Sequence, residues 1–250
     1  MRIIFVVLIA AFAVLASPVA YAQTDPALRG VVSDYMAIAE EMDPIRAAQR
    51  GDAAAALRWP DDSPEAVARR RTALAAIAAR LDQLSGLSES DMLERDALAY
   101  RVSIQREGYA FDEERVPFIN GEGFFINPDY ASTVTVLRNE AEAEAWLTRM
   151  AAVPAYFGVQ IANMRRGMAS RFTQPRLVVM NSLRAVQAQA ALPDADSPLL
   201  VPLARLPATM PEATRQRFQA RGAEIYATQI KPALQNLATI GLMVIRWMRD

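Results

Sequence analysis

Residues 63–104 read SPEAVARRRTALAAIAARLDQLSGLSESDMLERDALAYRVSI, and this stretch decides the fold class. It opens on Ser63, Pro64 and Glu65, which together are typical of a helix start: a capping hydroxyl, a proline in the first turn and a carboxylate that complements the helix dipole. Apolar residues then recur at helical spacing. They predict a narrow core-facing stripe formed by Val67, Leu74, Ile77, Leu81 and Leu84.

A second helix is expected directly after Gly86, a residue that commonly ends helices. Ser88 and Asp91 have the spacing of a capping box, and Leu87 and Met92 are placed to form a hydrophobic staple around it. The core-facing side of this helix is predicted to carry Leu93, Ala97, Tyr100 and Ile104. Two helices joined by so short a link are expected to form an antiparallel hairpin.

Helical spacing continues on both sides of this hairpin, so the predicted fold class is all-α, built from antiparallel helical hairpins and long helices. A first helix carries Leu28, Val32, Tyr35 and Ile38 on one face. The last long helix starts at Pro211 and should kink at Pro232, because proline removes a backbone donor. Its apolar end, residues 237–248, is interpreted as a core helix whose packing partner is missing from this chain.

Residues 116–126, VPFINGEGFFI, interrupt the helical pattern. An Asn-Gly pair between apolar runs is typical of a hairpin turn, although Pro117 and Gly123 weaken the strands. One short β-hairpin or ordered loop is therefore predicted here. Its aromatic residues either plug the helical layers, which is the commoner role of aromatics, or line a cleft. In the cleft alternative, the substrate contacts would come from Asn120, Glu122, Phe124 and Phe125.

Residues 1–22 have the pattern of a cleavable signal peptide: Arg2, an apolar run from Ile3 to Leu15, and the small-x-small triplet Ala20-Tyr21-Ala22. The apolar run is shorter than the roughly 20 residues that span a bilayer. We therefore expect a periplasmic or secreted protein whose mature chain, residues 23–250, forms a helical domain without a transmembrane span.

The 250-residue sequence contains no histidine and no cysteine. These residues are the usual zinc ligands and the usual partners in nucleophilic catalysis, so such sites cannot be built from this chain. The net charge is −1, with both signs interspersed, and no basic stretch predicts binding to nucleic acid. No cofactor and no metal are expected in this chain.

Two other sets of side chains are candidates for chemistry. Glu140, Glu142 and Glu144 are two residues apart, which turns them to different sides of a helix, and their expected role is to complement the helix dipole. Lys231 is the only lysine, and no serine precedes it by three positions, so Ser-Lys catalysis is not expected.

Three arginines could bind a substrate. Arg149, Arg165 and Arg166 could clamp a substrate carboxylate through bidentate hydrogen bonds. The commoner outcome for arginines on helix surfaces is solvation or pairing with an acid. Arg149 and Arg165 join the hairpin residues as candidate substrate contacts.

Several segments occur in an order that resembles one bacterial family, domain-of-unknown-function family 885 (DUF885). They are Asp43-Pro44, Gly51-Asp52, the helical hairpin of residues 81–98, AWLTRMAAVP at 145–154, IANMRRGM at 161–168, QPRLVV at 174–179, SPL at 197–199 and IKPAL at 230–234. The resemblance is to the N-terminal half of the family and extends to about Leu237.

DUF885 proteins are similar to helical zinc metallopeptidases of the gluzincin kind. The resemblance implies zinc ligands in a C-terminal half, in a Pro-Gly-His-type and a Glu-Gly-Trp segment that have no counterpart here. One hypothesis is therefore an exported N-terminal half that walls a peptide cleft, is inactive alone and leaves zinc binding to the C-terminal half. The other is a non-catalytic periplasmic helical module for binding or interaction.

Overall fold

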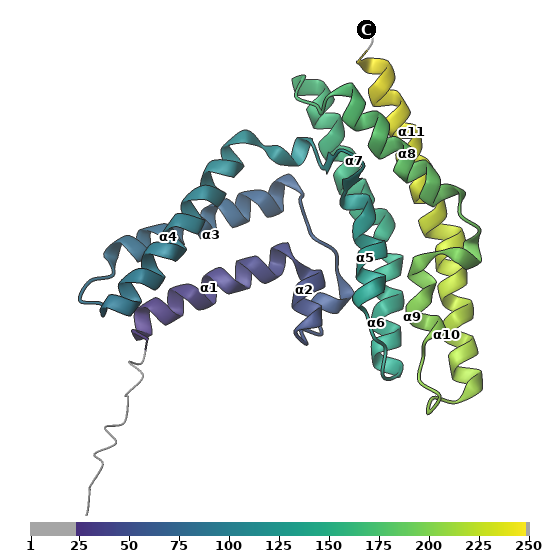
Figure 1. Cartoon of the computed structure of the whole chain (residues 1–250), viewed down its shortest axis with the longest axis horizontal. Coiled ribbons are helices and arrows are strands. Elements are labelled where there is room, and N and C mark those ends of the chain that lie inside the picture. The colour runs from purple at the N-terminus through teal and green to yellow at the C-terminus, as the bar shows by residue number, and fades with distance from the viewer. Residues whose placement is uncertain (1–23, 249–250) are drawn as a thin grey trace, which may run out of the picture.

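The computed structural model describes residues 24–248, which are mostly helical (Figure 1). The signal-peptide prediction for residues 1–22 lies outside this range. The helices are α1 (Pro26–Met42), α2 (Pro44–Gln49), α3 (Pro64–Gln83), α4 (Glu89–Gly108), α5 (Asn127–Val134), α6 (Glu140–Ala151), α7 (Val153–Ser170), α8 (Arg176–Ala191), α9 (Val201–Ala204), α10 (Glu212–Ile225) and α11 (Lys231–Trp247). Strands β1 (Phe118–Ile119) and β2 (Glu122–Gly123) form the hairpin near 116–126. The all-α prediction is confirmed.

The helices surround two separate hydrophobic cores. Helices α1, α3 and α4 form an arm around the smaller core, and α5 to α11 form a larger body (Figure 1). The buried side chains of the arm come from all three of its helices; they include Leu28, Val31, Leu74, Ile77, Leu81, Leu98 and Val102. Burial of each such side chain contributes roughly 1.5–3 kcal/mol.

The hairpin of α3 and α4 forms much as its local signals predict. Ser63 caps α3 by accepting a hydrogen bond from the Ala66 amide at 3.3 Å, and Ser88 caps α4 by accepting one from the Asp91 amide at 3.2 Å. The two helices lie side by side (Figure 1). Capping satisfies amides at each helix start that have no partner within the helix.

The predicted inner face of α4 is wrong. Leu93, Tyr100 and Ile104 are exposed, and the buried residues of α4 are Asp91, Leu98 and Val102. The inner face also holds the carboxylate of Asp91, which accepts a hydrogen bond of 3.3 Å from the Asp25 amide at the start of α1. A stripe chosen by apolar spacing alone leaves out such a polar residue and here falls on the wrong side of the helix.

The β-hairpin closes through Asn120 and Gly121, with Phe118 opposite Gly123 and Ile119 opposite Glu122. Gly123 has a φ of 149°, and a Cβ added there would lie 2.5 Å from the Cβ of Phe118, so the position requires glycine. Phe118, Phe124 and Phe125 are buried in the larger core. The hairpin aromatics therefore act as a plug between helical layers, the alternative that the sequence favoured.

The C-terminal helices bear on two predictions: the kink at Pro232 and the packing of the apolar segment 237–248. A π-helical turn, Tyr226–Ile230, stands between α10 and α11 just before Pro232 and changes the hydrogen-bond register where the proline offers no donor. The apolar end of α11 packs against α8, and a Cβ at Gly241 would lie 3.1 Å from Leu183. The expectation of a missing packing partner is wrong for the inner face of this segment, which α8 of the same chain covers, whereas Leu242 and Met243 on the other face are each 53% exposed. None of the helices within residues 24–248 combines the length and apolar character needed to cross a bilayer.

Candidate functional site

One cavity of the described chain has a volume of about 550 Å³. It lies between α2 with the following segment 51–56 on one side, and residues 134–139 with α6 on the other. Most of its lining is apolar, from Ile45, Ala48, Ala53, Ala56, Val134, Val136, Leu137, Ala141, Ala145 and Trp146. This volume falls in the usual range for small-molecule pockets, which are typically apolar with a few placed polar groups.

Arg149, in the last turn of α6, is the buried charged residue of this cavity. Only 2% of it is exposed, and its guanidinium carbon lies 4.6 Å from the centre of the Trp59 ring. The Trp59 indole donates a hydrogen bond of 2.8 Å to the Arg149 carbonyl oxygen and stacks on Tyr156 with ring centres 5.6 Å apart. An aromatic layer from two distant segments thus holds the arginine in place.

Two nitrogens of the Arg149 guanidinium lack hydrogen-bond partners in the described chain around them. Its Nε and Nη2 atoms are buried and have no hydrogen-bond partner within residues 24–248. Burial lowers the pKa of Arg149 to about 10, against an opposing effect of Asp43. The side chain therefore remains charged at neutral pH, and a buried charge without a partner is costly.

The acids near this cavity have other arginines as partners. Asp43 pairs with Arg46 at 3.3 Å, and Asp52 lies 4.0 Å from Arg58. On α6, Glu142 accepts a hydrogen bond of 2.6 Å from the backbone amide of Arg138. The side chains of the same two residues form an ion pair, with 3.7 Å between Arg138 Nη1 and Glu142 Oε1. The uncompensated charge of the cavity is therefore positive and belongs to Arg149.

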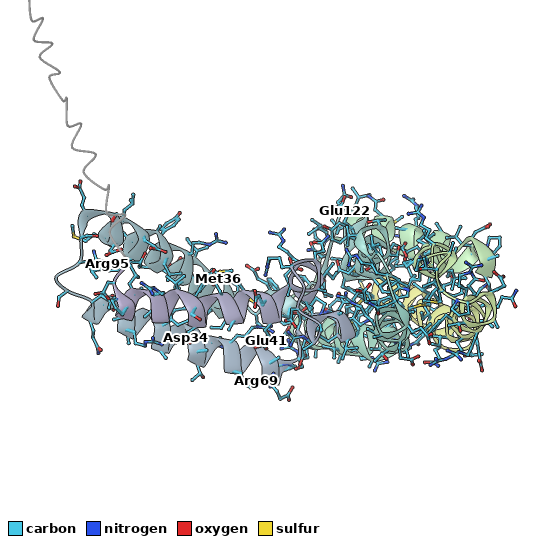
Figure 2. The ribbon with its side chains drawn as sticks, turned by 90° about the horizontal axis from the view of Figure 1, so that it is seen from below. Asp34, Met36, Glu41, Arg69, Arg95 and Glu122 are labelled. Carbon is cyan, nitrogen blue, oxygen red and sulfur yellow. The ribbon has the colours of Figure 1, made fainter. Side chains whose placement is uncertain are left out.

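The hairpin residues predicted to contact substrate lie in different surroundings. Asn120 is exposed and its side-chain oxygen accepts a hydrogen bond of 2.7 Å from Asn181. Glu122 lies at the edge of the body (Figure 2). Phe124 and Phe125 are buried and meet edge to face, and Phe124 also contacts Tyr156 with ring centres 6.1 Å apart. Of this group, Phe124 is linked to the Arg149 cavity, through Tyr156 and Trp59.

The three candidate arginines are not brought together. Arg149 lines the cavity, whereas Arg165 is exposed on α7. Arg166 forms a bidentate pair with Asp112, at 2.8 and 3.0 Å. Arg149 is thus the arginine of the three that is among the residues lining a space large enough for a ligand.

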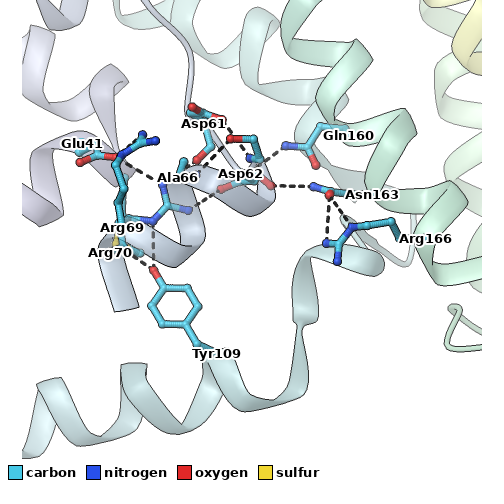
Figure 3. Close-up of polar contacts among 12 residues, drawn as sticks. Glu41, Asp61, Asp62, Ala66, Arg69, Arg70, Tyr109, Gln160, Asn163 and Arg166 are labelled. Atoms are coloured by element: carbon cyan, nitrogen blue, oxygen red, sulfur yellow. Dashed lines mark hydrogen bonds and ion pairs between the residues drawn. The ribbon is translucent and has the colours of Figure 1, made fainter. Parts of the chain in front are cut away.

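A polar junction between arm and body is the main feature that the sequence did not indicate (Figure 3). Arg70 of α3, 2% exposed, donates to the Asp61 carbonyl at 2.6 Å and pairs with Asp62 at 3.4 Å. From α7 of the body, Gln160 donates to the Asp62 carboxylate and Asn163 to its carbonyl, both at 2.9 Å. One signal was present: Arg70 stands four residues before Leu74, in step with the buried stripe of α3.

The remaining charged candidates form separate ion pairs. Glu140 pairs with Arg217 at 3.3 Å, and Glu144 accepts two hydrogen bonds from Arg221, which lower the pKa of Glu144. Glu140 and Glu144 are four residues apart and share the face of α6 that meets α10, so the prediction that the three acids point to different sides holds only for Glu142, which pairs with Arg138. Asp194 binds Lys231 and raises the pKa of Lys231, which is opposite to what a general base needs. Within residues 24–248 no set of three potential ligands is arranged to hold a metal ion, so the residues present do not fit a zinc site.

A family model described as "Bacterial protein of unknown function (DUF885)" matches residues 44–241, from α2 to α11. The chain belongs to the DUF885 family. The matched range contains both walls of the Arg149 cavity and both sides of the polar junction. This result confirms the family on which the ordered sequence segments converged.

A solved structure has the same fold as this DUF885 chain. The crystal structure of a "putative lipoprotein" from Colwellia psychrerythraea is similar with a TM-score of 0.76 and 10% sequence identity. The similarity covers 88% of this chain and 42% of the Colwellia chain, so this DUF885 chain spans less than half of that protein's length. No curated protein matches the sequence.

Proposed function

We propose that this chain is the exported, helical N-terminal half of a metallopeptidase-like DUF885 hydrolase. In this proposal the chain walls a peptide cleft, carries no zinc ligands and is inactive alone. The observation that supports it most is the match to 42% of the Colwellia protein at a TM-score of 0.76. A protein of that fold has room for a second half, and zinc ligands would have to come from there because this sequence has no histidine or cysteine.

The exposed apolar stripe of α4 also favours this proposal. Leu93 is 73% exposed and Tyr100 69%, and together with Ile104 they lie on one face of the helix. Large side chains grouped on one face mark a surface that another polypeptide covers. In this proposal, the second half of the protein covers the exposed stripe of α4.

Activity measurements on the purified chain test this proposal directly. We expect no hydrolysis of fluorogenic peptides with or without added zinc, and no zinc retained after dialysis. Stoichiometric zinc together with hydrolysis that a chelator abolishes would contradict the proposal. A positive test starts from the nucleotide sequence beyond codon 250: a downstream frame encoding helices with His and Glu should, when coexpressed, give a zinc-bound complex with chelator-sensitive activity.

Export is tested separately, by purifying the protein from the periplasmic fraction of an expression host. Signal-peptide cleavage should leave a chain that begins at Gln23, and the intact mass reports this. A full-length chain retained in the cytoplasm would contradict the export part of the proposal without affecting the rest.

The second candidate function is an independent binding module, and the Arg149 cavity favours it because the chain builds this cavity from its own residues. The two candidates differ in the behaviour of the isolated protein. A half of a larger fold should bind a hydrophobic dye at the α4 stripe and self-associate, whereas an adapted module should remain a clean monomer or a defined oligomer.

A further inference from the structure

We propose that the cavity beside Arg149 is a binding site for a ligand that carries one carboxylate on an apolar group. Peptide C-termini with an apolar last residue and medium-chain fatty acids share this chemistry. The site goes beyond the proposed function, because this chain forms it alone: all its lining residues lie between positions 45 and 149. It is independent of any zinc-binding second half.

The charge of the ligand follows from Arg149. The residue is 2% exposed, and its buried Nε and Nη2 atoms have no hydrogen-bond partner within the described chain. Asp43, Asp52 and Glu142 pair with other arginines, and although the charge of Asp43 also acts on Arg149, none of these acids hydrogen-bonds to its guanidinium. A carboxylate is the group that a guanidinium binds best, through two parallel hydrogen bonds.

The mostly apolar walls of the cavity favour a ligand with a single negative charge. The guanidinium of Arg149 neutralises one negative charge, the second arginine of the lining, Arg138, already pairs with Glu142 at 3.7 Å, and the apolar walls offer no charge. A dianionic phosphate would leave a second charge facing apolar side chains and the acids Asp52 and Glu142, which is unfavourable. A monoanion avoids this cost, so the cavity favours a carboxylate over a phosphate monoester.

The body of the ligand follows from the volume and from the rigid support behind the arginine. About 550 Å³ accommodates an apolar group of several carbon atoms besides the carboxylate. Trp59 holds the guanidinium by stacking and fixes its backbone by a hydrogen bond to the Arg149 carbonyl, so the arginine is oriented before a ligand binds. Such preorganisation lowers the cost of binding.

Calorimetric titration of the purified chain tests the site with two matched pairs of probes. Octanoate is compared with octanol, and the dipeptide Ala-Leu with its C-terminal amide. We expect each carboxylate to bind at least about tenfold more tightly than its uncharged counterpart, since only the carboxylate pairs the buried charge. The ratio of octanoate to dipeptide affinity then tells a fatty-acid site from a peptide site.

Variants locate the binding. Arg149→Gln should weaken carboxylate binding at least about tenfold, whereas Arg165→Gln, an exposed arginine on α7, should leave it unchanged. Ala145→Phe keeps Arg149 but fills the cavity from α6, and it should abolish binding while the circular dichroism spectrum stays that of the parent protein. Ala145→Phe therefore tests whether the ligand binds in the cavity even if Arg149→Gln does not fold.

Three results would overturn the proposal. They are no carboxylate binding by the folded parent protein, equal affinity for a carboxylate and its uncharged counterpart, and binding that persists unchanged in Ala145→Phe. These results are separate from those that bear on the proposed function, which depend on zinc retention and peptide hydrolysis.

Discussion

The side chain of Gln160, on α7 of the body, donates a hydrogen bond of 2.9 Å to the carboxylate of Asp62, which lies just before α3 of the arm. The same carboxylate pairs with Arg70 at 3.4 Å, and Arg70 is 2% exposed. Asp62 therefore links two helical units that have separate hydrophobic cores. The orientation of the arm rests on a polar contact of this kind rather than on a continuous apolar core.

Replacing Asp62 by Ala should destabilise the protein by about 2–3 kcal/mol, because buried Arg70 and the Gln160 amide both lose a charged partner. Urea denaturation followed by circular dichroism measures this change. Asp61→Ala is the matched control: its carbonyl still accepts from Arg70, and only an exposed hydrogen bond to the Ser63 amide is lost. We expect a cost of about 0.5–1 kcal/mol there. Equal costs for the two variants would show that the Asp62 contacts do not hold the arm.

Gly167 of α7 should not tolerate alanine, although alanine is the better helix former. A Cβ there would lie 2.7 Å from the carbonyl oxygen of Phe172 and 2.8 Å from that of Arg115, and backbone atoms cannot easily move away. Gly167→Ala should cost about 1–3 kcal/mol in the free energy of unfolding. Gly158, on the same helix, has no atom within 4 Å of its added Cβ, so Gly158→Ala should stabilise by about 0.5–1 kcal/mol. Stabilisation by both substitutions would contradict the close approach at Gly167.

The corrected face of α4 is open to a direct test with two leucines. Leu98 is 8% exposed and lies in the smaller core, whereas Leu93 is 73% exposed. Leu98→Ala should lower the free energy of unfolding by about 2–5 kcal/mol, and Leu93→Ala should change it by no more than about 0.5 kcal/mol. Thermal unfolding of the two variants under the same conditions checks the difference. The reverse order would restore the face that apolar spacing suggests.

Helix starts were predictable because their signals are local. Ser63 and Ser88 cap α3 and α4 by accepting hydrogen bonds from amides three residues later, and a sequence displays that spacing directly. Helix faces were less predictable, since buried polar residues interrupt the apolar pattern. Asp91, on the inner face of α4, accepts its hydrogen bond from the start of α1, 66 residues away. Periodicity within one helix carries no information about such a partner.

The candidate site shows the same limit. Arg149 was among the candidate substrate contacts, but its difference from Arg165 and Arg166 comes from Trp59, which binds it across 90 residues of sequence. Trp59 lies between α2 and α3, a stretch in which no helical spacing marks a core position. The residue type and its place on a helix were predictable. Its burial and its lack of a carboxylate partner emerged only from the packing of distant segments.

Glu114, whose carboxyl group is affected by the charges of Asp62 and Arg70 of the polar junction, should make stability depend on pH. Burial, with help from the nearby charges of Asp62 and Asp112, raises the pKa of Glu114 above its ordinary value of 4.5, and its Oε2 atom is buried without a hydrogen-bond partner in the described chain. The folded protein then holds this proton more tightly than the unfolded chain, so stability falls as the pH rises from the ordinary pKa through the raised one.

Glu114→Gln keeps the shape of the protonated acid but cannot ionise. Its melting temperature relative to the parent protein should therefore increase between about pH 4 and pH 7. A difference that stays flat with pH would mean that Glu114 ionises equally easily in the folded and unfolded states.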